Sequence, residues 1–354
     1  MNEGFEDDRP SIPPPGALVG GKYRLDRLLG HGGMGVVYSA THTLLDVPVA
    51  VKVLTATGSN TIRRFMNEAR AAARIQSEHV TRVSDFGTTD SGQPFMVMEL
   101  LEGEDLDDML KRRKVLPIEE AVDYVVQALA GMSEAHALGI VPRDLKPKNL
   151  FLTWRAGRPR VKVLDFGISK DLGEDSSIST AGNVLGSPVY MAPEQLRGGK
   201  VDARTDLWAA GVLLYQLTTG ARPFGEGERS VFASVLEDEP PPLRSVRPDV
   251  PEAFEAVVMK CLHKKPDERW STAAELVDAL APFLSEDGKA TLAALRASVP
   301  SLRPLPTLEE AEASSRPPAP AAPSTPPRRA LLVIAIVAGV LACGAIALAW
   351  AIAR

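Results

Sequence analysis

The chain has 354 residues, of which 45% are hydrophobic and 24% are charged, and its formal net charge is −5. At roughly 150 residues per domain, this length allows two domains or one large domain with attachments. The apolar content excludes a wholly disordered acidic protein, and the absence of a basic excess makes nucleic acid a poor partner. Two cysteines, one of them in a lipid-like segment, exclude a disulfide framework.

Composition divides the chain into four parts. Residues 1–22 are rich in Pro, Asp and Glu and lack apolar periodicity, which predicts a disordered leader. Ordered patterning spans residues 23–284. Residues 285–329 are rich in Pro and Ala, which predicts a linker with one short helix near residues 292–295.

The last part, residues 330–353, carries no charge and predicts a transmembrane helix. At ~1.5 Å per residue it would span about 36 Å, against about 30 Å of hydrocarbon. A buried Ala-rich helix is the alternative, but such helices rarely run so long without a charge. Arg328 and Arg329 precede the segment, so we expect a single pass through the cell (inner) membrane with the upstream chain in the cytoplasm. Small residues on one face would also permit helix pairing and a homodimer.

Candidate chemistry begins in the glycine-rich residues 29–35. Closely spaced glycines let backbone amides approach phosphate oxygens. Val36-Val37-Tyr38 then favours a second strand, so the glycines cap a hairpin instead of opening the helix that a dinucleotide fold requires. The next predicted strand, residues 47–54, places Lys52 among apolar neighbours. A solvent-exposed edge lysine is the plainer alternative for such a residue.

A predicted helix over residues 60–76 carries Glu68 beside its apolar stripe. Taken alone, Glu68 is expected to be a solvated charge on the helix surface. If it faces Lys52, its carboxylate would hold the Lys52 ammonium toward the α and β phosphates of a nucleotide. Residues 94–101 predict a strand, and residues 117–138 predict a long helix with a core face.

A loop at residues 140–152 brings a carboxylate, an ammonium and an amide into six positions, as Asp144, Lys146 and Asn149. A strand at residues 161–164 then delivers Asp165-Phe166-Gly167. The same tripeptide occurs at Asp85-Phe86-Gly87, but no such loop precedes it. We therefore expect Asp85 to be a turn residue at the end of a strand.

These motifs, in this order, resemble those of the bacterial (Hanks-type) serine/threonine protein kinases over residues 23–284. The resemblance extends to Met191-Ala192-Pro193-Glu194, to Asp206-Leu207-Trp208 and to Arg269. It implies an α+β, bilobal fold in which a small lobe has an antiparallel sheet and one helix, and a larger lobe is mainly helical. It also implies a buried ion pair between Glu194 and Arg269.

The resemblance assigns a role to each matched residue, with ATP and Mg²⁺ as cofactors. Asp144 would orient the substrate hydroxyl and accept its proton, and Lys146 would stabilise the γ phosphate. Asn149 and Asp165 would bind Mg²⁺. The implied ATP-binding residues are Leu29, Gly30, His31, Gly32, Gly33, Met34, Gly35, Val36, Val37, Ala50, Lys52, Glu68, Glu99 and Leu101.

One position departs from the family pattern, because Pro142 stands where the family has His before Arg143-Asp144. Proline supplies neither an imidazole nor a backbone N–H, so we expect a weaker brace for the loop. Two functions stay open: a kinase that phosphorylates itself and cytoplasmic proteins on Ser or Thr, and an ATP-binding pseudokinase scaffold. We expect phosphorylation of Ser179 or Thr180 to regulate the loop at residues 165–194 through Arg143.

Overall fold

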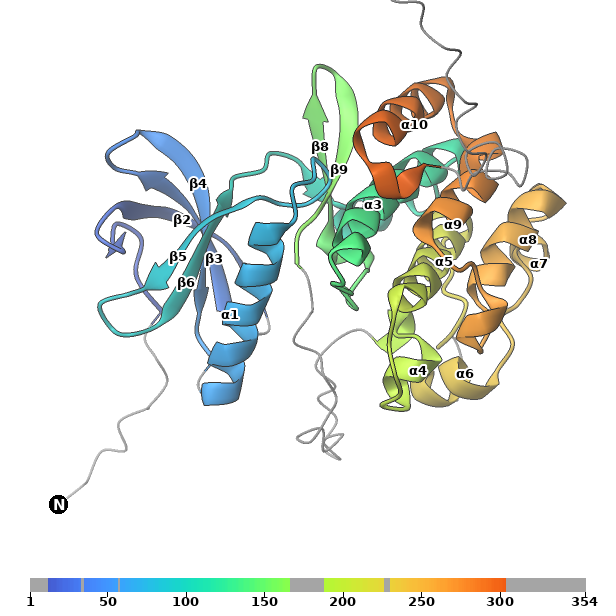
Figure 1. Cartoon of the computed structure of the whole chain (residues 1–354), viewed down its shortest axis with the longest axis horizontal. Coiled ribbons are helices and arrows are strands. Elements are labelled where there is room, and N and C mark those ends of the chain that lie inside the picture. Colours follow the sequence, from blue (N-terminus) through green and yellow to red (C-terminus); the bar gives the residue numbers. More distant parts are fainter. Residues whose placement is uncertain (1–11, 33–34, 57, 166–187, 226–229, 304–354) are drawn as a thin grey trace, which may run out of the picture. The chain divides into compact units, whose positions relative to one another are not determined.

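The computed structural model describes residues 12–32, 35–56, 58–165, 188–225 and 230–303. They form a small lobe built on a sheet and a larger lobe built on helices (Figure 1). This arrangement confirms the predicted bilobal fold. Residues 305–354 make up a separate unit and lie outside the described part of the chain.

The small lobe is a six-stranded antiparallel sheet in the order β1-β2-β3-β4-β6-β5, with one helix, α1, on one face. Phe65 and Ala69 of α1 pack on that face with Ala50 and Met98. The opposite face has its own core. The bounds are β1 (Leu18–Val19), β2 (Tyr23–His31), β3 (Gly35–His42), β4 (Val47–Leu54), α1 (Ser59–Arg74), β5 (Val83–Thr88) and β6 (Pro94–Glu99).

The larger lobe has a three-stranded sheet, β7 (Glu104–Asp105), β8 (Leu150–Arg155) and β9 (Arg158–Val163), beside its helices. Helix α5 is enclosed by the others, and its Trp208, Leu213 and Tyr215 are almost fully buried. The helices are α2 (Leu106–Arg113), α3 (Ile118–Ala137), α4 (Pro193–Leu196), α5 (Ala203–Thr219), α6 (Val231–Glu237), α7 (Leu243–Val246), α8 (Glu252–Cys261), α9 (Ala273–Leu280) and α10 (Glu286–Ser298).

The packed body extends past both predicted boundaries. On the N-terminal side, residues 12–22 include β1, and the carbonyl of Pro13 accepts a hydrogen bond from the Tyr38 hydroxyl at 2.7 Å. On the C-terminal side, α10 and the turn after it pack on α3. Four residues with helix-like spacing are buried there, namely Leu292, Leu295, Val299 and Leu302. Residues 12–22 of the predicted leader and residues 285–303 of the predicted linker therefore belong to the packed body, and the helix predicted near residues 292–295 is present within α10. The rest of both segments, residues 1–11 and 304–329, lies outside the described part of the chain.

Within the described residues, no helix combines the length and apolarity needed to cross a bilayer. The span predicted at residues 330–353 lies outside that part of the chain. The same holds for Gly33, Met34 and the predicted regulatory residues 166–187.

Candidate active site

Lys52 lies on β4, at the centre of the small lobe's sheet. Its Nζ is 3.3 Å from Glu68 Oε1 on α1 and 2.8 Å from Asp165 Oδ1, just after β9. Alternation along β4 explains the direction, because the flanking Val51 and Val53 are buried in the core of the opposite face. The predicted pairing of Lys52 with Glu68 is confirmed.

Burial and charge compete within this trio. Desolvation alone would lower the pKa of Lys52, but the carboxylates of Asp165 and Glu68 outweigh it and raise that pKa. Burial raises the pKa of Glu68 to about 7, although the Lys52 ammonium opposes the shift. The charge of the Glu68 carboxyl group therefore responds to pH near neutrality.

The loop before β8 gathers the three predicted polar groups. Lys146 Nζ lies 2.8 Å from Asp144 Oδ2, and Asn149 Nδ2 donates to the same oxygen at 3.0 Å and to the Asp144 carbonyl at 2.9 Å. Asn149 is buried in the short turn Pro147–Asn149. These bonds fix the Asp144 carboxylate from two sides.

Asn149 and Asp165 fit the donor set of Mg²⁺, which prefers carboxylate and carbonyl oxygens. The amide nitrogen of Asn149 is engaged by Asp144, which leaves its Oδ1 as the metal-binding atom. The carboxylate of Asp165 is 40% exposed, so it has room to bind a cation beside its contact with Lys52. The backbone joins the two segments, since the Leu164 N–H donates to the Asn149 carbonyl at 2.9 Å.

Asp206 of α5 supports the loop that carries Asp144 through a hydrogen bond to the backbone. Its Oδ1 accepts the N–H of Arg143 at 2.9 Å, and its Oδ2 lies 2.7 Å from His136 Nε2. Arg143 has a φ of 64°, an uncommon conformation for a residue with a side chain, so this hydrogen bond holds a strained backbone in place. Motif matching included Asp206 without indicating this role.

A second brace holds the strand that leads to Asp165. The backbone N–H of Val163 donates to the His79 carbonyl, and the N–H of Thr81 donates to the Val163 carbonyl, both at 2.9 Å. His79 Nδ1 also lies 2.9 Å from the Val161 carbonyl. Burial lowers the pKa of His79 to about 4, so its ring is neutral at pH 7. Sequence reasoning missed this residue because a lone His carries no spacing signal.

The glycine-rich hairpin joins β2 to β3. Gly35 needs to be glycine, because a Cβ there would lie 2.2 Å from the Val53 carbonyl oxygen. Val37 lies on the α1 face of the sheet, against the cluster that contains Ala50 and Met98. Val36 points to the opposite core and is 2% exposed, so its place in the ATP-binding set stays a prediction that would depend on its backbone. The other described residues of the set, Leu29, Gly30, His31 and Gly32, lie along the hairpin.

Strand β6 ends at Glu99, two positions before Leu101, which is only partly buried. The Glu99 side chain contacts Lys162 Nζ at 2.6 Å and accepts the N–H of Arg82 at 2.9 Å. Because these bonds engage the carboxylate, any role of Glu99 in holding a nucleotide falls to its backbone.

Asp85, in the earlier copy of the tripeptide, has a structural role. Its carboxylate accepts a hydrogen bond from the Tyr23 hydroxyl and pairs with Lys22, both at 2.7 Å. It lies within β5 and not in a turn at the strand end, so its expected position is corrected. The contacts fasten the start of β2 to β5.

Glu194 and Arg269 form the predicted ion pair. Two N–H···O bonds of 2.8 Å join them, and the Arg269 side chain is fully buried. Arg269 also donates to the carbonyls of His263, Lys264 and Arg204. The prediction is confirmed, and the pair ties α4 to the segment between α8 and α9.

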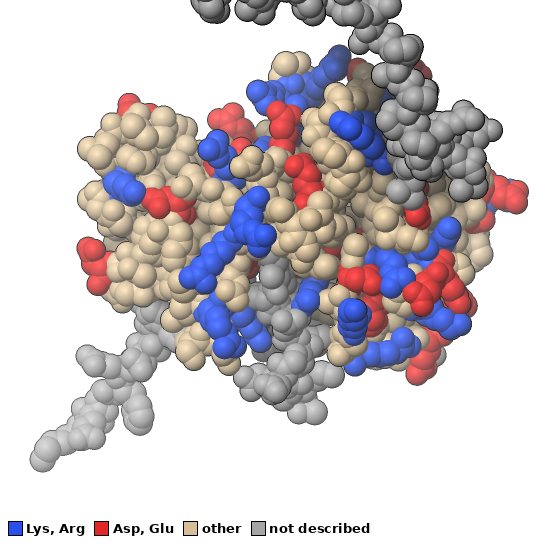
Figure 2. Space-filling view, in the orientation of Figure 1, with Lys and Arg blue, Asp and Glu red and all other residues tan. Residues whose placement is uncertain are grey.

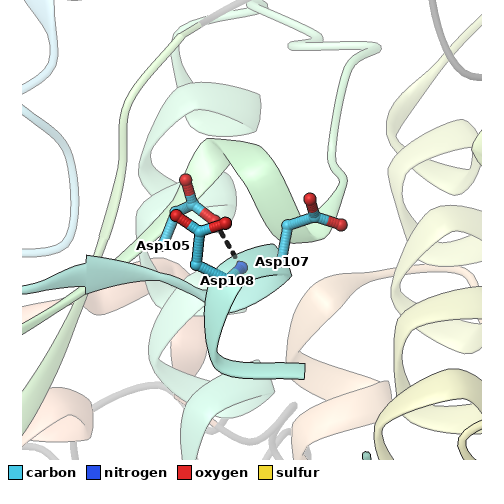
Figure 3. A group of neighbouring side chains, drawn as sticks. All are labelled: Asp105, Asp107 and Asp108. Carbon is cyan, nitrogen blue, oxygen red and sulfur yellow. Dashed lines mark hydrogen bonds between the residues drawn. The ribbon is translucent and has the colours of Figure 1, made fainter. Parts of the chain in front are cut away.

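Three aspartates stand together where β7 meets α2 (Figure 3). Asp105 Oδ1 accepts the N–H of Asp108 at 2.9 Å and so caps α2. Lys111 Nζ lies 3.0 Å from Asp107 and 2.7 Å from Asp108. Capping and ion pairing account for the cluster without a metal.

Comparison with known proteins agrees with this geometry. The protein kinase domain family matches residues 23–280. Serine/threonine-protein kinase pkn3 of Myxococcus xanthus is 42% identical over 268 residues, covering 73% of this chain and 49% of that protein. Serine/threonine-protein kinase PknH of Mycobacterium tuberculosis is 38% identical over 291 residues, covering 81% and 46%. The chain thus spans about half the length of these relatives.

Solved structures give the same result at the level of the fold. The kinase domain of Mycobacterium tuberculosis PknI is 29% identical, covers 77% of this chain and 100% of its own length, and superposes with a TM-score of 0.59. A single-substitution variant of that domain is 27% identical, covers 77% of this chain and 99% of its own length, and superposes with a TM-score of 0.61. Family, relatives and structures all cover the two lobes that hold Lys52, Asp144 and Asp165. The chain therefore belongs to the protein kinase family, and its domain is a protein-serine/threonine kinase of the bacterial type.

Proposed function

We propose that the chain transfers the γ phosphate of ATP to Ser or Thr hydroxyls of cytoplasmic proteins and of itself. The observation that carries the proposal is the meeting of Lys52, Glu68 and Asp165, beside a loop in which Lys146 and Asn149 bond Asp144. Phosphoryl transfer demands little covalent chemistry from a protein and depends on positioning and charge. These six side chains supply both.

Each side chain has a physical task in this proposal. Lys52, fixed by Glu68, holds the α and β phosphates. Asp144 orients the substrate hydroxyl and accepts its proton, while Lys146 offsets charge on the γ phosphate. Asn149 and Asp165 would hold Mg²⁺, which would supply positive charge against the phosphate groups of the nucleotide.

The test is incorporation of phosphate by the purified full chain with ATP and Mg²⁺, read by mass spectrometry. We expect phosphoserine and phosphothreonine in the wild type and losses of at least ~100-fold in Asp144→Asn and Lys52→Met. Lys289→Met, which removes an exposed lysine on α10, is the matched control and should keep full activity. Equally low incorporation in the wild type and both site variants would refute the proposal.

Pro142 supports a second candidate, an ATP-binding scaffold with little turnover. It stands where the family has His, directly before Arg143 and Asp144, and it is buried. Pro142→His separates the two functions. A wild type that binds ATP without transferring phosphate, and a variant that gains transfer, would favour the scaffold.

We also propose that residues 330–353 anchor the domain in the cell membrane as one transmembrane helix, with the kinase on the cytoplasmic side. The support is their length without charge and the two arginines that precede them. Deletion of residues 330–354 should move the protein from the membrane fraction to the soluble fraction. Crosslinking of the full chain within membranes tests the homodimer that its small residues permit.

A further inference from the structure

Helix α1 presents three arginines in one exposed row. Arg63, Arg70 and Arg74 are seven and four residues apart, so they lie within about 40° of one another around the helix and extend over about 16 Å. Figure 2 shows basic side chains gathered over the region where Figure 1 places α1. Within the described part of the chain, no carboxylate lies at ion-pair distance from any of the three. An acidic partner would be electrostatically complementary to this arginine row.

An apolar groove of about 250 Å³ runs beside the row, between α1 and β5. This volume is below the ~300 Å³ at which small-molecule pockets begin, and it suits a single anchoring side chain. Small residues on α1 open the space, and Arg70 stands at its rim. The apolar lining consists of Met66, Ala69, Ala73, Val83 and Phe86.

The chain itself contains a segment with matching chemistry. Residues 1–11 carry four carboxylates, on Glu3, Glu6, Asp7 and Asp8, against the single basic side chain of Arg9. Phe5 is the one aromatic residue among them. An aromatic residue flanked by acidic residues is complementary to an apolar groove flanked by arginines.

This segment is joined to the small lobe, which also contains the groove between α1 and β5. The described chain begins at Ile12, and seven residues of extended chain from there to Phe5 reach about 24 Å. Lys22 and Tyr23, shortly after β1, bind Asp85, which belongs to the groove lining. The Lys22 ammonium also offsets the Asp85 charge that would otherwise repel an acidic segment.

We propose that residues 3–8 bind their own kinase domain, with Phe5 in the groove between α1 and β5 and the carboxylates on the arginine row. Helix α1 carries Glu68 on its inner side, so the docked segment holds the helix where Glu68 contacts Lys52. The N-terminus of α1 is only weakly stabilised by its own sequence. Its N-cap is Gly58, which makes no side-chain hydrogen bond, and its first turn has no acidic residue. The docking stands independently of catalysis, whereas its effect on activity rests on the proposed function.

Photocrosslinking tests the docking directly. A benzophenone amino acid replaces Phe5 in the full chain, and the crosslinked peptides are mapped by mass spectrometry. We expect crosslinks within one chain to α1 or β5, at a yield independent of protein concentration. Crosslinks to other surfaces, crosslinks between two copies, or none at all would overturn the proposal.

Charge reversal supplies the specificity control. Arg70→Glu with Arg74→Glu should lower the crosslink yield roughly three-fold or more, and adding Asp7→Lys with Asp8→Lys should restore it. Arg27→Glu, at an exposed position on β2 without an ion pair in the described residues, should leave the yield unchanged. The wild-type yield should also fall at 1 M salt, where the screening length is only about 3 Å. A yield insensitive to these reversals would refute the role of the row.

Loss of residues 1–11 should lower the phosphorylation rate about three-fold or more relative to the full chain. The crosslinking experiment is done on the full chain and does not depend on this rate. A protein that crosslinks as expected but transfers no phosphate keeps the docking proposal and refutes the proposed activity. A protein that is equally active with and without the segment refutes the regulatory step. The two failures are therefore distinguishable.

Discussion

Lys52 and Asp165 are 113 positions apart in the sequence, and their charged groups meet at 2.8 Å. One is presented by the central strand of the small lobe's sheet and the other by the exit of β9 in the larger lobe. Glu68 joins them from α1, so three separate elements converge on one ammonium. A charge cluster drawn from such distant segments is the basis for the first prediction.

Lys52→Met should reduce kcat by at least ~100-fold and change the melting temperature little. Stability should survive because Glu68, whose pKa burial already raises, can take up a proton once the ammonium is gone. Kinetic assays and thermal melts of the full chain measure both quantities. A large fall in melting temperature would contradict this view of Glu68.

The activity should fall as the pH drops through about 7, because protonated Glu68 no longer holds Lys52. Stability should follow the opposite course. The folded state binds a proton that the unfolded state releases between an ordinary pKa near 4.5 and about 7, so this group's contribution to stability declines as pH rises through that range. Glu68→Gln should flatten both profiles, and an unchanged activity profile in that variant would assign the pH response to another group.

His79 should make stability fall in acid. Its folded pKa of about 4 lies below the ordinary 6.5, so between these values only the unfolded state binds the proton. The free energy of unfolding should drop by up to about 3 kcal/mol as pH falls across this window. Urea titrations at several pH values measure it, with His79→Gln as the variant that loses this slope.

Arg269→Ala should lower the free energy of unfolding by about 3 to 5 kcal/mol, because it leaves the Glu194 carboxylate buried and unpaired by its main partner. Arg112→Ala breaks a solvent-exposed pair with Glu104 and is the control, with an expected cost of about 1 kcal/mol or less. Denaturant unfolding compares the two. Equal losses of unfolding free energy in the two variants would mean that burial does not determine how much the Glu194–Arg269 pair contributes to stability.

Asp206→Ala should lower kcat about ten-fold or more, because the N–H of Arg143 loses its acceptor and the strained loop relaxes. Asp206→Asn keeps an oxygen in the same place and should retain most of the rate. Steady-state kinetics with varied ATP distinguishes this from a binding defect, since KM for ATP should change less than kcat. Identical losses in both variants would refute the hydrogen-bond explanation.

The main site residues could be predicted because each belongs to a short sequence motif, and the motifs follow one another in the order typical of phosphoryl transfer by kinases. Lys52, Glu68, Asp144, Asn149 and Asp165 all lie where the motifs indicated. Their supports could not be predicted in the same way. His79 and Asp206 act through single hydrogen bonds to backbone atoms far away in the sequence, and such contacts leave no periodic pattern.

Two other differences have equally local causes. Val36 and Val37 are chemically identical, and only the strand's register decides that one enters the opposite core while the other faces α1. Helix α10 was predicted as a minor feature of a linker because residues 285–329 as a whole are rich in Pro and Ala. Its four buried apolar residues become a pattern only when the turn after the helix is included.

Because α10 packs on α3, the packed body of this chain ends later than the family match does. The family match ends at residue 280, while the last buried apolar side chain among the described residues is Leu302. A chimaera that joined this kinase to a foreign tail at the family limit would strip a hydrophobic cover from α3. Exchange of downstream segments between related kinases should therefore succeed only when the junction falls after residue 303.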